Sequence, residues 1–431
     1  MHHVDHISVT NFWGRYTFAT ALSPQVTIFI GENGTGKTTL INLIAAALAA
    51  DFLTLDKLPF ESIEIRLASK ISRKKPRIIV SKRRDPNTGL EAIDYRILPT
   101  SRSDEIAFSL DDIEEQRILR RRPGMPPSYH LRQSRRTKDL TSNLGDLVAI
   151  IWLSIHRATL SSDYDDVRRP ERNYDSTVDA KISELNGRIS RYYSLLTSKR
   201  DESVRDFQEF IFISLLEELE ESGLFENIKK ADLESEKVAL FEAFQRLGVS
   251  PNRFQKKANA YFSRLKSAKD REDSSVTASQ LQAMVVLQQI QQITKKWSEE
   301  KSKQDEIFED YNSFISITNE LLVGKNLSIS ATSELMAKNK RDEIVDLLKL
   351  SSGEKQLIIL LGEALLQQHK TCVYIADEPE LSLHVKWQEK VISSILSLNE
   401  NAQMIVATHS PDIIGKYSKN VIKMERLLLD D

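Results

Sequence analysis

The stretch that decides the fold is Gly31-Glu32-Asn33-Gly34-Thr35-Gly36-Lys37-Thr38. It follows Val26-Thr27-Ile28-Phe29-Ile30, a run of β-branched and aromatic residues typical of a buried strand. It precedes residues 40–50, an Ala- and Leu-rich segment that we expect to be a helix. Glycines allow a tight turn whose backbone N–H groups face phosphate, and a following helix N-terminus adds to that attraction. The sequence therefore predicts a phosphate-binding loop.

The residues of this loop have separate expected roles. We expect Lys37 to reach the β- and γ-phosphates of ATP and the Thr38 hydroxyl to ligate Mg²⁺. The remaining nucleotide contacts are expected from Asn33, Gly34, Gly36 and Thr39. An ordinary Gly-rich turn is the alternative, and the complete motif between a strand and a helix argues against it.

A second apolar stretch, Val373-Tyr374-Ile375-Ala376, ends in the adjacent acids Asp377 and Glu378. A buried strand has no structural need for two carboxylates at its end, so these acids indicate a metal or water site. We expect Asp377 to hold Mg²⁺, directly or through a water. We expect Glu378 to be the general base that orients the water attacking the γ-phosphate. An acidic loop start is the alternative.

Between these motifs lies Leu350-Ser351-Ser352-Gly353-Glu354-Lys355-Gln356, which we place at the start of a helix. Ser352 and the helix N-terminus would form an anion site. Taken alone, the segment is an ordinary helix cap. Its position favours the functional interpretation, because Ser352 comes 25 residues before Asp377.

The order of these motifs resembles ABC-type ATPases of the SMC/Rad50/OLD branch. Asp377-Glu378-Pro379-Glu380-Leu381-Ser382-Leu383-His384 is similar to the Walker B motif and D-loop of that branch, and Thr408-His409-Ser410-Pro411 to its switch histidine. The match covers about residues 1–165 and 345–425. It implies an α/β fold: an ABC ATPase head with a mixed parallel sheet and an antiparallel side sheet, interrupted by a helical or coiled-coil insertion.

The resemblance also implies how the site works. Two heads would clamp two ATP molecules, with Ser352 and Gly353 of one head capping the γ-phosphate held by the other, as a homodimer or higher homo-oligomer. His409 would sense or polarise that phosphate, and Arg15, beside Asn11-Phe12, would lie near the nucleotide base. Gln116 and Gln133 are the candidates for the Q-loop.

Differences from the relatives narrow the function. The helical insertion contains no cysteine for a zinc hook and is too short to entrap DNA, and only 22 residues follow His409, so we expect no nuclease domain. The remainder resembles the stand-alone ATPase subunits of antiphage systems such as PARIS or Septu. This resemblance implies a separately encoded effector protein, for which a nuclease is one candidate, and a phage protein as trigger. The alternatives are a Rad50/RecF-like DNA-binding ATPase of repair or maintenance, and a non-hydrolysing ATP switch, which the intact Glu378 disfavours.

The chain divides into three predicted segments: residues 1–170 and 336–431 as the two halves of the head, and residues 171–335 as the insertion. In the insertion, apolar residues recur with coiled-coil spacing at Ile182, Leu185, Ile189, Tyr192 and Leu196. A compact helical bundle is the alternative to protruding arms. Strands are expected at 63–67, 77–80 and 92–97 with a turn at 85–89, and a long loop at 101–135.

Composition bounds the partners and the compartment. The single cysteine, Cys372, excludes an intramolecular disulfide, and no apolar run reaches the roughly 18 residues of a membrane span. With no secretory signal at the N-terminus, we expect a cytoplasmic protein without membrane contact. Residues 1–172 hold 26 Lys+Arg against 21 Asp+Glu, concentrated at residues 66–84, 120–122 and 132–138. Such clusters either bind nucleic acid or an acidic protein, or are solvated surface, so we expect any nucleic-acid binding to be weak.

Overall fold

The computed structural model describes residues 1–84, 91–100, 105–110, 138–153, 176–214, 216, 228–246, 249–270 and 277–428. The chain forms two compact units. One consists of Met1–Ser190 with Ser313–Asp431 and contains the sheets, and the other, Arg191–Asn312, is helical where it is described. The fold is mixed α/β, as predicted.

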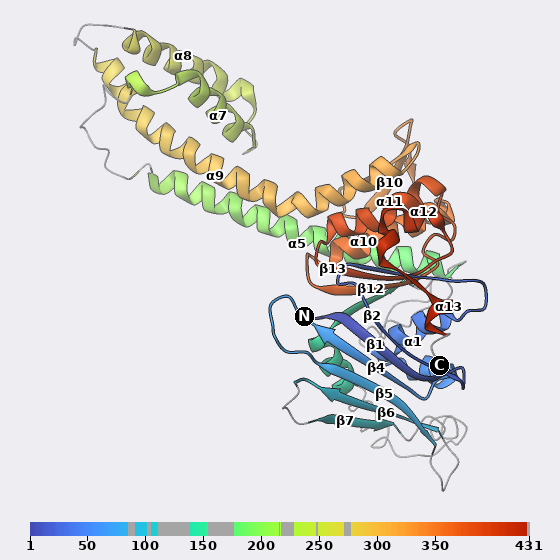
Figure 1. Ribbon diagram of the computed structural model, residues 1–431. Helices are drawn as coiled ribbons and strands as arrows, with labels where there is room; N and C mark the ends of the chain where they lie inside the picture. The colour runs from blue at the N-terminus through green and yellow to red at the C-terminus, as the bar shows by residue number, and fades with distance from the viewer. Residues whose placement is uncertain are drawn as a thin grey trace, which may run out of the picture. The chain divides into compact units, whose positions relative to one another are not determined.

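A five-stranded parallel sheet positions the candidate site. Its spatial order is β14 (Val421–Lys423), β3 (Val26–Ile30), β13 (Ala402–Ala407), β12 (Cys372–Asp377) and β8 (Ala149–Leu153). Helix α1 (Lys37–Ala49) lies on one face, and α10 (Ser352–Leu366) and α11 (Val385–Leu398) lie on the other (Figure 1). Covered faces explain why these strands are apolar along their length. Because the strands are parallel, the loops that follow β3, β12 and β13 meet at one edge.

A six-stranded antiparallel sheet forms the side of this unit (Figure 1). Its spatial order is β2 (Tyr16–Ala21), β1 (His3–Phe12), β4 (Ser62–Ala68), β5 (Arg77–Arg84), β6 (Glu91–Leu98) and β7 (Ile106–Leu110). Strands β4, β5 and β6 confirm the three predicted there. The long loop predicted at 101–135 is wrong at β7, a short run that becomes a strand by pairing with β6. The turn at 85–89 and the rest of that loop lie outside the described residues.

Helix α1 lies in the core between the two sheets. Nine of its 13 residues are buried, as expected of a helix that is apolar on all sides. On the antiparallel side, the Tyr95 hydroxyl of β6 donates a hydrogen bond to the Ala47 carbonyl at 3.1 Å. On the other side, α1 packs on β12 and β13. A short helix, α2 (Phe52–Lys57), follows it.

A small antiparallel sheet was not predicted. It consists of β9 (Lys325–Ile329), β10 (Leu335–Asn339) and β11 (Ile344–Val345), and the short helix η1 (Leu347–Lys349) leads from it to α10. Its strands are two to five residues long, which is too short for a clear periodicity. The chain continues after β13 with α12 (Pro411–Ile414) and η2 (Gly415–Asn420), and α13 (Met424–Leu427) follows β14.

The helical unit is built on two long helices, α5 (Thr177–Ser214) and α9 (Ala278–Leu321), both of which begin or end in the other unit. They run antiparallel, since Tyr193 contacts Tyr311 whereas Phe207 contacts Trp297. Helices α7 (Leu233–Arg246) and α8 (Pro251–Lys269) share an apolar cluster with α9. Residues 182–196, whose apolar spacing predicted a long helix, lie in α5. The helical unit, Arg191–Asn312, takes in fewer residues than the predicted insertion, residues 171–335.

Candidate active site

The phosphate-binding loop connects β3 to α1. Gly34 and Gly36 have φ of 85° and 88°, a left-handed conformation that glycine adopts readily. Lys37 is buried, and its ammonium group donates to the carbonyls of Gly31 and Glu32, both at 3.0 Å. The Lys37 ammonium group and the N-terminus of the 13-residue helix α1 both lie at this loop, and both attract an anion.

An aromatic pair packs against this loop from the end of β1. The rings of Phe12 and Trp13 are stacked with centroids 5.3 Å apart. A Cβ atom at Gly36 would lie 3.0 Å from Phe12 and 3.1 Å from Trp13, so a larger residue at this position would displace the rings. Sequence analysis placed Asn11-Phe12 and Arg15 near the nucleotide. In the structure, Arg15 is exposed and its guanidinium lies over the Tyr16 ring, 4.7 Å from the centroid.

Asp377 meets the phosphate-binding loop at the edge of the parallel sheet. Thr38 Oγ1 donates to Asp377 Oδ1 at 3.1 Å across 339 residues of sequence. Mg²⁺ takes oxygen ligands at about 2.0–2.1 Å in octahedral geometry, so two adjacent ligands are about 3 Å apart. The separation of Thr38 and Asp377 therefore fits one magnesium ion between them.

Glu378 follows Asp377 in a left-handed backbone conformation, with φ of 48°. Burial, and then the neighbouring carboxyls of Glu380 and Asp377, raise the pKa of Glu378 from 4.5 to about 7. His409, after β13, places its Nε2 3.7 Å from Glu378 Oε1. A carboxylate with a pKa near neutrality is suited to accept a proton from water.

Glu380 is a site residue that sequence analysis did not single out. This buried side chain accepts hydrogen bonds at Oε1 from the Thr408 hydroxyl, from the His409 N–H at 3.2 Å and from the Ser410 N–H at 3.3 Å. It therefore fixes the loop that carries His409 beside Glu378. Its place in the acidic motif was visible, but its partners lie about 30 residues further along the chain.

Glu425 of α13 is a second residue that sequence analysis missed. Its Oε1 accepts a hydrogen bond from the Glu32 backbone N–H of the phosphate-binding loop at 2.8 Å, and this bond is the main cause of a lowered Glu425 pKa. A Cβ atom at Gly31 would lie 2.9 Å from the same oxygen. The parallel pairing of β14 with β3 brings the two segments together.

The signature segment caps α10. Ser351 is the N-cap: its side chain accepts from the Glu354 N–H, and the Glu354 side chain accepts from the Ser351 N–H. This capping box leaves Ser352 exposed at the first position of the helix. Gly353 packs directly on the D-loop, because a Cβ atom there would lie 2.2 Å from the Ser382 carbonyl oxygen.

Ion pairs attach α10 to the elements beside it. Lys325 of β9 pairs with Glu354 at 2.7 Å, and Lys355 pairs with Asp179 of α5 at 2.5 Å. Further along, Arg188 of α5 pairs with Glu363 at 2.8 Å. The side chains of Leu185 and Ile189, two of the predicted heptad residues, lie closely against Gly362. The signature helix therefore packs against the first thirteen residues of α5.

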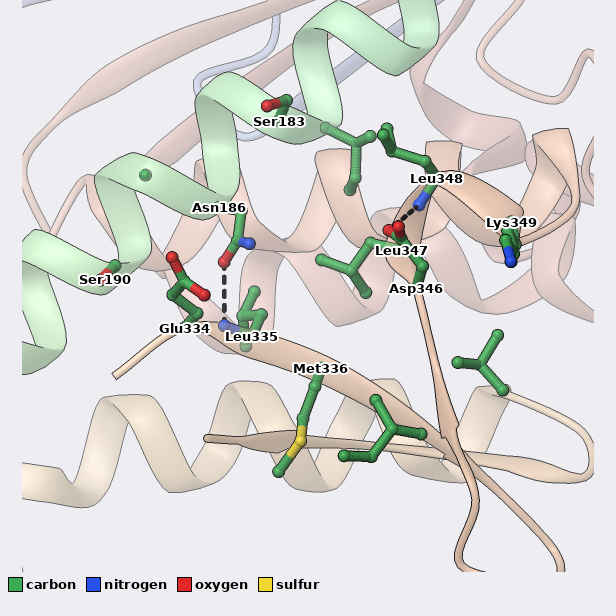
Figure 2. Close-up of a pocket in the computed structure, with 14 residues that line it drawn as sticks. Ser183, Asn186, Ser190, Glu334, Leu335, Met336, Asp346, Leu347, Leu348 and Lys349 are labelled. Carbon is green, nitrogen blue, oxygen red and sulfur yellow. Dashed lines mark hydrogen bonds between the residues drawn. The ribbon is translucent and has the colours of Figure 1, made fainter. Parts of the chain in front are cut away.

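A cavity of about 850 Å³ opens between α5, β10 and the residues that precede the signature. Figure 2 shows the two hydrogen bonds that shape it. Asn186 of α5 accepts from the Leu335 N–H at 2.8 Å, and Asp346 accepts from the Leu348 N–H at 2.9 Å. The cavity ends at Lys349, two residues before Ser351, and includes no residue of the phosphate-binding loop.

The structure brings most predicted site residues to one edge of the parallel sheet. Residues 33–39 lie after β3, Asp377 and Glu378 after β12, and His409 after β13, which lies between those strands. Within the described residues, no hydrogen bond or ion pair joins Ser352 or Gly353 to residues 31–38. Gln116 and Gln133 lie outside the described residues.

Two retron ATPases are among the proteins to which this chain is similar. Over 221 residues the chain is 23% identical to the retron Ec83 probable ATPase of Escherichia coli. This alignment covers 46% of this chain and 41% of that relative. Over 110 residues it is 28% identical to the retron Vc95 probable ATPase of Vibrio cholerae. This second alignment covers 23% of this chain and 21% of that relative. The chain thus matches less than half the length of these relatives.

Among solved structures, the Smc head domain of Pyrococcus furiosus, with an extended coiled coil and bound to ScpA, superposes with a TM-score of 0.39. It is 15% identical and covers 98% of this chain and 93% of that one. Within the described ranges, no helix has the length and apolar character needed to cross a bilayer. The model of the AAA ATPase domain family AAA_15 matches residues 3–414. The chain therefore belongs to the AAA ATPase domain family.

Proposed function

We propose that this protein is a cytoplasmic ATPase subunit of a bacterial antiviral defence system. It binds ATP with Mg²⁺, hydrolyses it slowly and uses ATP-dependent pairing of two heads to hold or activate a separately encoded effector. The observation that carries the proposal is the contact of Thr38 with Asp377, beside the pair formed by Glu378 and His409. The relatives named as retron ATPases and the resemblance to antiphage ATPase subunits support the role in defence.

Each residue has one task in the proposed reaction. The Lys37 ammonium and the loop N–H groups would bind the β- and γ-phosphates, and Thr38 and Asp377 would hold Mg²⁺, whose charge would offset that of the phosphate oxygens. Glu378 accepts a proton from the attacking water, for which its pKa of about 7 is suited. His409 polarises the γ-phosphate from beside Glu378.

Pairing of the heads is proposed from Ser352. This residue is exposed at the N-terminus of a 15-residue helix, and Gly353 behind it is fixed on the D-loop. A helix N-terminus that presents a free hydroxyl is suited to the γ-phosphate of a second head. The minimal active unit would then be a homodimer, and a phage protein would act as the trigger.

The proposed pairing is tested with a variant that binds but does not turn over ATP. Glu378→Gln should retain ATP and elute as a dimer when its mass is measured by light scattering after gel filtration. Adding Ser352→Arg should return it to a monomer that still binds ATP. The matched control is Ser267→Arg, at an exposed serine of α8, which should leave the dimer intact. A monomer with full ATPase activity would contradict the proposal, and so would a wild-type rate in Glu378→Gln.

The effector is tested by co-purification of the tagged full chain from its native operon, with and without ATP. We expect the product of a neighbouring gene to remain bound to Glu378→Gln in ATP and to be lost from Ser352→Arg. Retention by both variants alike would show that the partner does not depend on head pairing.

A further inference from the structure

A basic groove of about 900 Å³ lies on the antiparallel sheet, away from the phosphate-binding loop. Five cations line it: Arg66, Arg73, Lys74, Lys75 and Arg77. They belong to the end of β4, the loop after it and the start of β5, and the groove also includes His6 of β1. Phe12, six residues further along β1, packs near Gly36, so the groove lies about 20 Å from the nucleotide site at about 3.3 Å per residue.

The cations of the groove differ in how far other residues neutralise them. The Glu64 carboxylate forms ion pairs with Arg66 at 2.9 Å and with Arg77 at 3.7 Å. In the described part of the chain, no carboxylate forms an ion pair with Arg73, Lys74 or Lys75. The single acid among the described lining residues is Asp5. Within the described ranges, Arg73, Lys74 and Lys75 therefore keep three positive charges for a ligand.

The basic run seen in the sequence is thus divided by the fold. Beyond the groove, the Lys82 ammonium donates to the carbonyls of Asp56 and Leu58 at 2.8 and 2.7 Å. Arg83 pairs with Asp94 at 3.4 Å. These two cations stabilise the sheet, whereas residues 73–75 face the groove. If the whole basic run were solvated surface, its cations would not separate into a group that stabilises the sheet and a group that faces a groove.

The remaining lining residues identify the kind of ligand. They are His6, Ser72 and Thr100, so the described lining residues include no aliphatic side chain and no carbocyclic aromatic ring. The exposed Ile71 lines a separate hollow of about 220 Å³. Protein partners are anchored by buried aromatic or aliphatic side chains, which this groove does not accommodate. Contacts to a phosphate backbone need only cations and hydroxyl groups.

We propose that this groove binds the phosphate backbone of a nucleic acid without reading its bases. Loop residues 69–75 are held for this contact by Ser69, whose hydroxyl accepts from the Ile71 and Ser72 N–H groups, and by Ser72, which accepts from the Lys74 N–H. Among the described lining residues there is no amide side chain, and the one aromatic ring is the half-buried imidazole of His6. The cations and hydroxyl groups predominate, so most contacts go to phosphate and binding depends little on base sequence.

Three available cations set the expected strength. Each neutralised phosphate contributes a slope of about −0.7 to −0.9 to the dependence of log affinity on log salt, so the total is about −2 to −3. Affinity should then fall by about 20- to 40-fold between 50 and 200 mM salt. At physiological salt, Kd should lie in the range of about 10⁻⁴ to 10⁻⁶ M that is usual for non-specific binding.

The test is fluorescence anisotropy of the full-length protein with labelled 25-nucleotide single strands and 25-base-pair duplexes of DNA and RNA, titrated with salt. We expect the combined change Arg73→Ala, Lys74→Ala and Lys75→Ala to lower affinity at least tenfold at 50 mM salt and to remove about two units of slope. The matched control is Lys338→Ala, Lys340→Ala and Arg341→Ala, which removes three cations from β10 and the residues after it. It should leave affinity and slope unchanged.

Equal losses in both triple variants would show an effect of net charge and would overturn the proposal. An unchanged slope in the groove variant would also overturn it. So would a partner protein that binds through residues 73–75 when nucleic acid does not, since the groove would then be a protein surface. Thermal unfolding of each variant shows that the fold is retained. The readout is binding, so its failure is distinct from failure of the proposed ATPase function.

Discussion

Replacing Glu380 by glutamine should shift the pH dependence of ATP hydrolysis and leave the fold intact. The amide oxygen of glutamine can accept the bonds from Thr408, His409 and Ser410. The substitution removes the hydrogen bond and the charge that, after burial, raise the pKa of Glu378. That pKa should therefore move from about 7 towards 4.5.

The direction of the rate change follows from the role of Glu378 as a base. Only its ionised form accepts a proton, so wild-type kcat/KM should fall as pH drops through about 7. At pH 6 about a tenth of Glu378 would be ionised in the wild type, so Glu380→Gln should gain up to about tenfold in relative rate there. The free energy of unfolding should also depend on pH through the Glu378 carboxyl. The folded protein holds this proton more tightly than the unfolded chain, so wild-type stability should fall as pH rises from 4.5 to about 7, and the variant should lose less.

Glu380→Ala is the contrasting variant. It leaves the buried Thr408 hydroxyl without its acceptor, while the Ser410 N–H keeps a bond to Thr408 Oγ1 at 2.8 Å. One orphaned buried donor costs about 1–3 kcal/mol of unfolding free energy. Steady-state ATPase rates from pH 5 to 8.5 and urea unfolding measure both effects. An acidic limb that stays at pH 7 in Glu380→Gln, or equal destabilisation by the two substitutions, would refute the reasoning.

Three further changes test other parts of the site. Lys37→Ala should abolish ATP binding in calorimetry, because the loop loses its buried cation; retained affinity would contradict the assignment. Gly353→Ala should lower ATPase activity and ATP-dependent dimerisation, since its Cβ would lie 2.2 Å from a D-loop carbonyl oxygen, whereas Gly187→Ala, with no atom within 4 Å, is the control. Lys355→Met should lower the free energy of unfolding by leaving Asp179 unpaired, and adding Asp179→Asn should restore part of it; additive losses would show that the pair contributes nothing.

Local backbone geometry explains which parts of the fold the sequence predicted. The phosphate-binding loop needs glycine at φ of 85° and 88°, and its flanking strand and helix are apolar along most of their length, so motif and context coincide. Strands β7, β9 and β10 are as short as β3 but include polar residues, and neighbouring strands decide their conformation. A pattern within one segment therefore does not reveal them.

The same reasoning applies to the candidate site. Glu378 and His409 follow buried strands, where a polar residue is conspicuous in the sequence. Glu425 accepts from a backbone N–H group, and Glu380 accepts from two backbone N–H groups besides the Thr408 hydroxyl, so side-chain type marks few of their partners. The contact of Glu425 with Glu32 spans 393 residues and depends on strand order. Long-range contacts to the backbone are the part of a site that a single sequence does not display.

The attachment of α10 to α5 has a consequence for how this chain can diverge. Its contacts, from Asp179 to Ile189, fall within the first thirteen residues of a 38-residue helix. Substitutions at Lys355 and Asp179 should therefore occur together among homologues, and so should those at Arg188 and Glu363. The residues of α5 from Arg191 onward belong to the other compact unit, so we expect homologues to vary the length of the helical segment there by whole turns while the contacts at Asp179–Ile189 are kept.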